Sequence, residues 1–163
     1  MRVFILGSYR SADGSQRDFE RLARLESHLS GRGYDSFLAV HRDFDGTDLS
    51  NMSPREKTLK LAGSSDLNLF VFTVTGIRNG LVAELTEIQS RFPELSWKHV
   101  VLLEEGLILS SVLDESQGGV LSIRPVKQIG FQDDKDLLRI AEQVAFNYAW
   151  QRGPGHCLRA RKK

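Results

Sequence analysis

Apolar positions along this chain alternate between short unbroken runs and sets that recur at helical spacing. The most continuous run occupies residues 67–72 and contains Leu67, Leu69, Phe70, Val71 and Phe72. A short run of this kind, rich in aromatic and branched side chains, is typical of a strand that is covered on both faces. We therefore expect residues 67–72 to form the central strand of a parallel sheet.

Further apolar runs predict the other strands of that sheet. They are Val3–Leu6, Asp35–Val40, Lys98–Leu103 and, for the fifth strand, either Val120–Ile123 or Val126–Ile129. Helical spacing predicts helices between them, at Gln16–Leu29, from Pro54 to Ala62, from Leu81 to a break at Phe92-Pro93, and at Leu137–Trp150, with a short helix or turn at Leu107–Leu113. Ser53, Pro54 and Glu56 resemble a capped helix start.

Regular alternation of strand and helix predicts an α/β fold with a doubly wound, mainly parallel sheet of five strands in the order 2-1-3-4-5. The first and third strands are then neighbours. Their carboxyl-end loops, Gly7–Gly14 and Thr73–Gly80, should flank one crevice where the strand order reverses, which is where ligands bind in open α/β sheets.

Length and composition add few constraints. The 163 residues fit one domain, which we place at 1–152, followed by a basic tail at 153–163 that ends in LRARKK. A net charge of +1 gives no strong field for a polyanion, so nucleic acid is not expected as a partner. The lone cysteine, Cys157, and the absence of an apolar stretch near the ~20 residues that span a bilayer favour a cytoplasmic protein.

Two segments carry the candidate chemistry. Gly7, Ser8, Tyr9 and Arg10 place a hydroxyl and a guanidinium beside a helix amino end, which could hold a phosphate or a sugar hydroxyl. Taken alone, the motif is better explained by a turn glycine and a solvated arginine. Glu84 is expected in the first turn of the helix after the central strand, where a carboxylate can also serve only to stabilise the helix dipole.

Acidic residues elsewhere invite weaker interpretations. Asp66 precedes the central strand, at the end of the sheet opposite the crevice, where it could simply cap a turn. Asp43, Asp45 and Asp48 lack the spacing and later glutamate of a calcium loop, so we interpret them as a solvated loop and predict no metal site. The sequence also indicates no cofactor.

Two segments together resemble the nucleoside 2-deoxyribosyltransferase superfamily, including its branch that hydrolyses deoxynucleoside 5'-monophosphates. They are VFILGSYRSADG, at Val3–Gly14, and SDLNLFVFTVTGIRNGLVAEL, at Ser65–Leu85. The first is similar to the aromatic-x-x-Gly-Ser-x-Arg opening of the hydrolase branch, and the second to the family's Ala-Asp strand followed by Gly-x-x-x-Glu-Leu. The resemblance covers about the first half of the chain.

The resemblance implies that Glu84 is a nucleophile that attacks the anomeric carbon of a sugar, with Asp66 as a second catalytic carboxylate. Substrate would be bound by two segments, comprising Gly7, Ser8, Tyr9, Arg10, Arg78 and Gly80. Arg78 stands where family members carry aspartate or a phosphate-binding serine, which favours a phosphorylated substrate. Phe4 replaces the hydrolase branch's tyrosine, and Thr86 replaces a glycine.

The sequence thus predicts cleavage or transfer of the N-glycosidic bond of a nucleoside or nucleotide. Two alternatives stay open, an NAD-cleaving enzyme related to Toll/interleukin-receptor domains and a nucleotide-binding sensor without catalysis. The expected partner is a small molecule rather than a membrane, and by resemblance the protein is at least a dimer. The base recognised and the acceptor of the sugar are not indicated.

Overall fold

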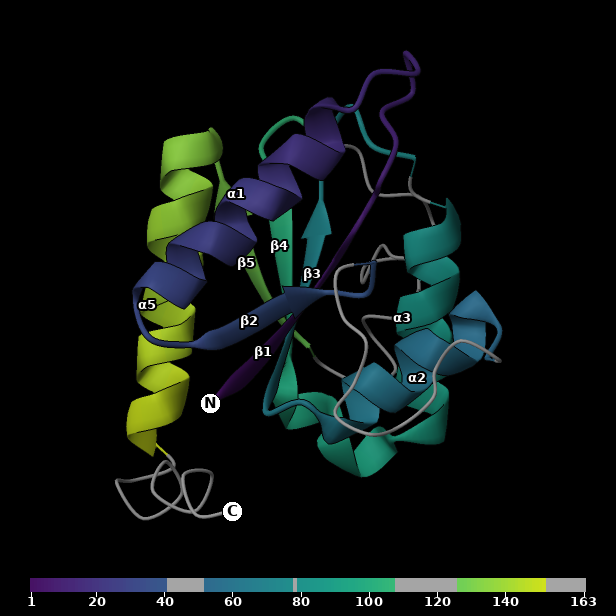
Figure 1. The fold of residues 1–163 in the computed structure, drawn as a ribbon, viewed down its shortest axis with the longest axis vertical. Coiled ribbons are helices and arrows are strands. Elements are labelled where there is room, and N and C mark those ends of the chain that lie inside the picture. The colour runs from purple at the N-terminus through teal and green to yellow at the C-terminus, as the bar shows by residue number, and fades with distance from the viewer. Residues whose placement is uncertain (41–51, 78, 108–125, 152–163) are drawn as a thin grey trace.

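A computed structural model describes residues 1–40, 52–77, 79–107 and 126–151 of the chain (Figure 1). Five parallel strands form one sheet in the order β2-β1-β3-β4-β5. The strands are β1 (Arg2–Gly7), β2 (Asp35–Leu38), β3 (Leu67–Phe72), β4 (His99–Glu104) and β5 (Lys127–Phe131). The predicted α/β fold and strand order are therefore confirmed.

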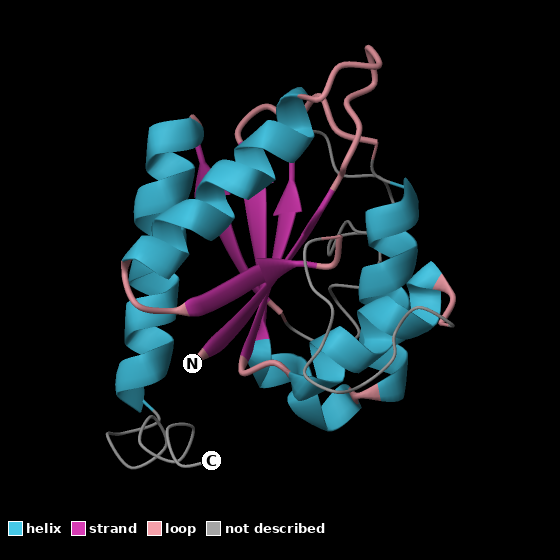
Figure 2. Ribbon diagram, in the orientation of Figure 1, coloured by secondary structure: helices cyan, strands magenta, loops and turns pink. Residues whose placement is uncertain are grey.

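Helices cover both faces of the sheet (Figures 1 and 2). One face is covered by α1 (Arg17–Gly31) and α5 (Asp134–Gln151), and the other by α2 (Pro54–Ser64) and α3 (Asn79–Arg91). A 3₁₀ helix, η1 (Pro93–Lys98), connects α3 to β4. Ser53 caps α2 in a full capping box with Glu56, as its sequence predicts.

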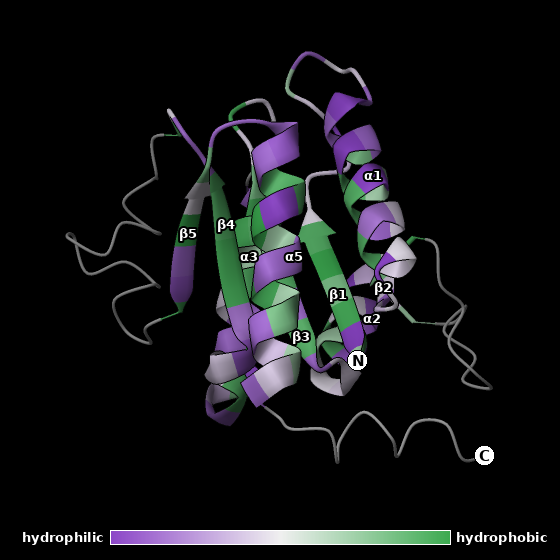
Figure 3. Cartoon of the chain, turned by 90° about the vertical axis from the view of Figure 1, so that its left-hand side faces the viewer, coloured by the Kyte–Doolittle hydropathy of each residue, from purple (hydrophilic) through white to green (hydrophobic). Residues whose placement is uncertain are grey.

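Strand residues alternate between the two layers. In β1, Val3 and Ile5 pack under α1 and α5, whereas Phe4 and Leu6 pack under α2 and α3. All six residues of β3 are buried, which confirms that this strand is covered on both faces. Figure 3 shows the same pattern as apolar inner strands between helices whose outer faces are polar. Phe4 is fully buried and stacks on Phe37, so this residue belongs to the core.

The predicted element boundaries differ from the structure at several points. The main difference is α3, which begins at Asn79 rather than Leu81 and therefore places Glu84 in its second turn. Asn79 and Gly80 are weak helix formers, which is why the sequence suggests a loop there. Strand β2 ends at Leu38, two residues earlier than predicted, and Lys98 closes η1 instead of opening β4.

The fifth strand confirms the second of the two alternatives, shifted slightly toward the carboxyl end. Helix α5 begins three residues before its predicted start because the side chain of Asp133 accepts a hydrogen bond from the Asp136 N–H at 2.8 Å. Several predictions lie outside the described residues, namely those on Asp43, Asp45, Asp48, Cys157, Arg78, the alternative strand Val120–Ile123, most of Leu107–Leu113 and the tail at 153–163. None of the described helices has the length and apolar character needed to cross a membrane.

Candidate active site beside the joined strand-end loops

The loops that follow β1 and β3 lie against each other at the carboxyl edge of the sheet (Figure 1). Ser11 and Gly76 form an isolated antiparallel bridge between them. The Ala12 N–H donates to the Thr75 carbonyl at 2.7 Å, and the Ile77 N–H donates to the Arg10 carbonyl at 3.2 Å. The predicted adjacency of these two loops at the point where the strand order reverses is confirmed, and the crevice that they were expected to flank stays a prediction.

Ser8 helps to shape these loops. Its hydroxyl donates to the Arg10 carbonyl at 2.5 Å and accepts hydrogen bonds from the Ile77 N–H at 3.0 Å and the Arg10 N–H at 3.3 Å. The loops also approach closely at Gly76, where an added Cβ would lie 2.9 Å from the Ser8 Cβ. The Ser8 hydroxyl is therefore committed to loop structure, while Arg10 is exposed next to it.

Gly7 has a packing reason for being glycine. A Cβ at this position would lie 2.8 Å from both Cδ atoms of Leu22, a buried residue of α1. Its backbone φ is not positive, so space rather than an unusual conformation excludes a side chain. Gly80 differs, because it lies exposed in the first turn of α3 with open space where a Cβ would be.

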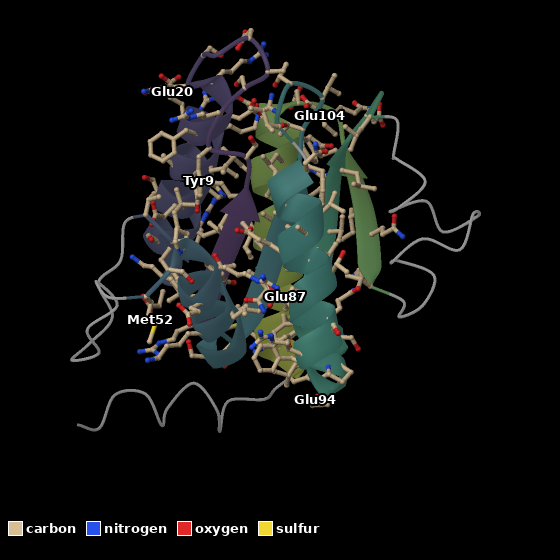
Figure 4. All side chains as sticks on the ribbon, turned by 90° about the vertical axis from the view of Figure 1, so that its right-hand side faces the viewer. Tyr9, Glu20, Met52, Glu87, Glu94 and Glu104 are labelled. Carbon is tan, nitrogen blue, oxygen red and sulfur yellow. The ribbon has the colours of Figure 1, made fainter. Side chains whose placement is uncertain are left out.

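Tyr9 is partly buried at the same end of the molecule as Glu104, opposite Glu94 (Figure 4). Its ring meets the edge of the Phe19 ring at a centroid distance of 6.0 Å. Burial raises the pKa of the Tyr9 phenol to about 12; a hydrogen bond with the Ala39 backbone opposes this shift, and the negative charges of Glu84 and Glu26 add to it. Tyr9 thus stays protonated at neutral pH, within the electrostatic reach of Glu84.

Glu84 is half-buried on the side of α3 that faces α2. The Thr58 hydroxyl of α2 donates to one of its carboxylate oxygens across a long 3.5 Å contact. Burial raises the pKa of the Glu84 carboxyl above its usual value, and this single hydrogen bond only partly offsets the cost of desolvation. A carboxylate that is desolvated and receives little compensating hydrogen bonding is a good candidate for a catalytic role.

A broad groove of about 1150 Å³ runs along α3 beside Glu84. Its described lining comes from the start of α2 and the length of α3, and comprises Pro54, Arg55, Asn79, Val82, Ala83, Glu84, Thr86, Glu87, Ser90 and Arg91. Glu87 forms ion pairs with both Arg55 and Arg91, so this part of the groove carries two positive charges against one negative charge. The groove is large enough for a nucleotide.

Asp66 lies at the opposite edge of the sheet from the joined loops, as its position in the sequence indicates. One of its carboxylate oxygens accepts a hydrogen bond from the Arg2 N–H at 2.8 Å, and its own N–H donates to the Arg2 carbonyl at 3.0 Å. These bonds hold the amino ends of β1 and β3 together. The structure does not bring Asp66 to the edge where Tyr9 and Arg10 lie.

The sequence interpretation missed Thr58, because a threonine inside a helix gives no sign of facing a carboxylate 26 residues away. It also missed the buried polar groups that join the two loops. Within the described ranges, no three His, Cys, Asp or Glu side chains are grouped so as to hold a metal ion.

Comparison with known proteins gives one informative result. No protein-family profile and no curated protein sequence matches the chain. Among solved structures, the chain is similar to the CMP N-glycosidase BcmB of Clostridium botulinum, with a TM-score of 0.57 and 18% sequence identity over 88% of this chain and 99% of that one. At this identity the likeness establishes a common fold.

Proposed function

We propose that this protein cleaves the N-glycosidic bond of a nucleoside 5'-monophosphate, with Glu84 as the nucleophile. The observation that carries the proposal is the half-buried Glu84 carboxylate, with its raised pKa, in a nucleotide-sized groove lined by α2 and α3. The fold shared with a CMP N-glycosidase and the resemblance of two segments to the deoxyribosyltransferase superfamily support the same class of reaction.

In the proposed reaction the Glu84 carboxylate attacks the anomeric carbon of the sugar. The new C–O bond forms as the C–N bond breaks, and the departing electron pair goes to the base nitrogen, which takes a proton from solvent water. Water or a second base next displaces the carboxylate and restores the enzyme. Tyr9, protonated at neutral pH, supplies a neutral hydroxyl near Glu84 without adding a second negative charge.

The resemblance also assigns a catalytic role to Asp66. Its carboxylate is hydrogen-bonded at the amino edge of the sheet, so the proposal depends on Glu84 and not on Asp66.

A panel of substrates tests this function directly. The protein should release free base from at least one nucleoside 5'-monophosphate, measured by chromatography after incubation with monophosphates, nucleosides and NAD. Release of nicotinamide from NAD alone would favour the NAD-cleaving alternative. Tight binding of a nucleotide with no base release would favour the sensor.

Arg10 provides a test of phosphate recognition. Because a guanidinium contact with phosphate contributes about 1.5–3 kcal/mol, Arg10→Ala should weaken binding of the 5'-monophosphate by roughly 10- to 100-fold and that of the matching nucleoside much less. Arg78→Ala should behave in the same way if both arginines hold the phosphate. Isothermal titration calorimetry on both ligands measures the difference.

The control for this experiment is Arg139→Ala, which removes an exposed arginine of α5 that pairs with Asp136. Its binding of both ligands should stay at the wild-type level. Equal losses for nucleotide and nucleoside in the Arg10 variant would remove the phosphate role.

A further inference from the structure

One buried carboxylate is bonded to both of the joined loops. Asp18 lies at the amino end of α1 with 1% of its surface exposed. The Ser11 hydroxyl, from the loop after β1, donates to it at 2.5 Å, and the Thr75 hydroxyl, from the loop after β3, lies 3.0 and 3.2 Å from its two oxygens. Asp18 therefore joins the start of α1 and the loop just before it to the loop after β3, which is 57 residues away in sequence.

Ser11 completes this arrangement. Its hydroxyl accepts a hydrogen bond from the Asp18 N–H at 3.2 Å while donating to the Asp18 carboxylate, so it caps α1 from the preceding loop. Ser11 is as fully buried as Asp18. Charge-assisted hydrogen bonds of this kind are stronger than neutral ones. Burial strengthens them further, because the local dielectric constant is low.

Helix α1 also supports the loop after β3 at a second point. Arg21, one turn after Asp18 and also buried, forms an ion pair with Glu104 at 3.1 Å. The other oxygen of Glu104 accepts a hydrogen bond from the Val74 N–H at 2.7 Å. Figure 4 shows Glu104 at the end of the molecule where these loops lie. Thus α1 fixes residues 74 and 75 through two separate contacts.

The amino end of α1 is consequently taken by the protein's own groups. In doubly wound sheets, the first helix commonly offers its amino end to a ligand phosphate. Here the first turn carries Asp18 and Glu20, and the Asp18 N–H is bonded to Ser11. The preceding loop also directs the N–H groups of Ser11, Ala12, Gly14 and Ser15 to acceptors within the two loops.

We propose that Asp18 is a positioning residue that holds the loops after β1 and β3 as one unit, and that it thereby sets the place of the substrate-binding residues on them. The catalytic part of this inference rests on the proposed function. The loops include Arg10 and Tyr9 on one side and lead directly into α3, which carries Glu84, on the other. Weakening the hydrogen bonds of Asp18 should therefore shift the bound substrate without altering the chemistry of Glu84.

Amide hydrogen exchange tests the coupling of the loops without requiring activity. Asp18→Asn keeps the size of the side chain but removes its charge and one acceptor, so the amides of Ala12 and Ile77, which donate across the loops, should exchange at least tenfold faster. Amides of β3 should be unchanged. Glu20→Gln, a neighbouring exposed acid on the same turn, is the matched control and should leave all these rates at wild-type values.

A second pair of variants avoids a folding defect at Asp18. Thr75→Val removes the hydroxyl that reaches Asp18 but keeps the shape of the side chain, and it should also speed exchange at Ala12 and Ile77. Thr75→Ser keeps the hydroxyl and should restore slow exchange. Unchanged exchange of both amides in Asp18→Asn and in Thr75→Val would overturn the proposal.

Kinetics separate positioning from a merely structural role. In Asp18→Asn and Thr75→Val, KM for the 5'-monophosphate should rise about tenfold, while the pH profile of kcat, which reports on Glu84, keeps its wild-type acid limb. A kcat loss with unchanged KM would contradict positioning of the substrate. If the wild-type protein releases no base from any nucleotide, the proposed function fails, and the exchange rates still decide whether Asp18 couples the loops.

Discussion

Glu84→Gln should lower kcat for base release by about a thousandfold or more, with nucleotide affinity changed only slightly. The glutamine keeps the size and most of the hydrogen bonding of the side chain, including the contact with Thr58. It lacks the negative charge and the nucleophilic oxygen that would form the bond to the sugar. Base release and nucleotide binding, measured on the same preparations, check both parts of this expectation.

Glu87→Gln is the matched control, because Glu87 lies in the same groove one turn further along α3. It should alter ion pairing with Arg55 and Arg91 and leave kcat within a few-fold of wild type. Glycosidase activity retained in Glu84→Gln would remove Glu84 as the nucleophile.

The environment of Glu84 also predicts how activity and stability respond to this change. Since burial raises the pKa of its carboxyl above 4.5, wild-type turnover should fall as the pH is lowered through a value above the ordinary glutamate pKa. A raised pKa means that folding disfavours the charged form, so Glu84→Gln should keep or slightly increase thermal stability at neutral pH. The helix-dipole contribution is small because Glu84 lies in the second turn.

Acid should destabilise the protein through His99, by up to ~3 kcal/mol between pH 6.5 and pH 4. His99 opens β4 and is 1% exposed, with its Nδ1 3.1 Å from the Asn68 amide nitrogen. Burial, helped by the positive charge of the adjacent Lys98, lowers the pKa of His99 from 6.5 to about 4. The unfolded chain therefore binds a proton at His99 from pH 6.5 downward, whereas the folded chain does so only near pH 4.

The sign of this effect follows directly. The contribution of neutral His99 to the free energy of unfolding is fully present above pH 6.5 and is lost as the pH falls toward 4. Denaturant titrations at several pH values should show this loss in the wild-type protein. In His99→Gln the free energy of unfolding should depend less on pH over the same range. Equal pH dependence in wild type and His99→Gln would contradict the prediction.

Much of the fold could be predicted because a strand that is buried on both faces has a recognisable, nearly continuous run of apolar residues. The unbroken apolar run of β3 and the alternation of strands with helices are enough to indicate a parallel sheet, and β3 is buried at every position. The start of α3 could not be predicted in the same way. Asn79 and Gly80 disfavour a helix locally, yet Leu81, Leu85 and Ile88 pack into the core and extend the helix over them.

The candidate site could be predicted only in part, for a related reason. Glu84 and Arg10 stand in recognisable local patterns. Asp18 and Thr58, by contrast, acquire their roles from partners that are distant along the chain, since Asp18 bonds to Thr75, 57 residues away, and Thr58 to Glu84. An acidic residue in a first helical turn ordinarily indicates only a favourable interaction with the dipole.

The division of the site between α3 and the loops bears on how such a protein can diverge. The helix that presents Glu84 is anchored by Leu81, Leu85 and Ile88 in the core, whereas Val74 and Ile77 on the loop before it are exposed. Substitutions at the exposed loop positions carry little penalty in the core and can change which ligand is accepted. If Glu84 is the nucleophile, selection could therefore vary substrate range at the loops while this carboxylate is inherited unchanged on its helix.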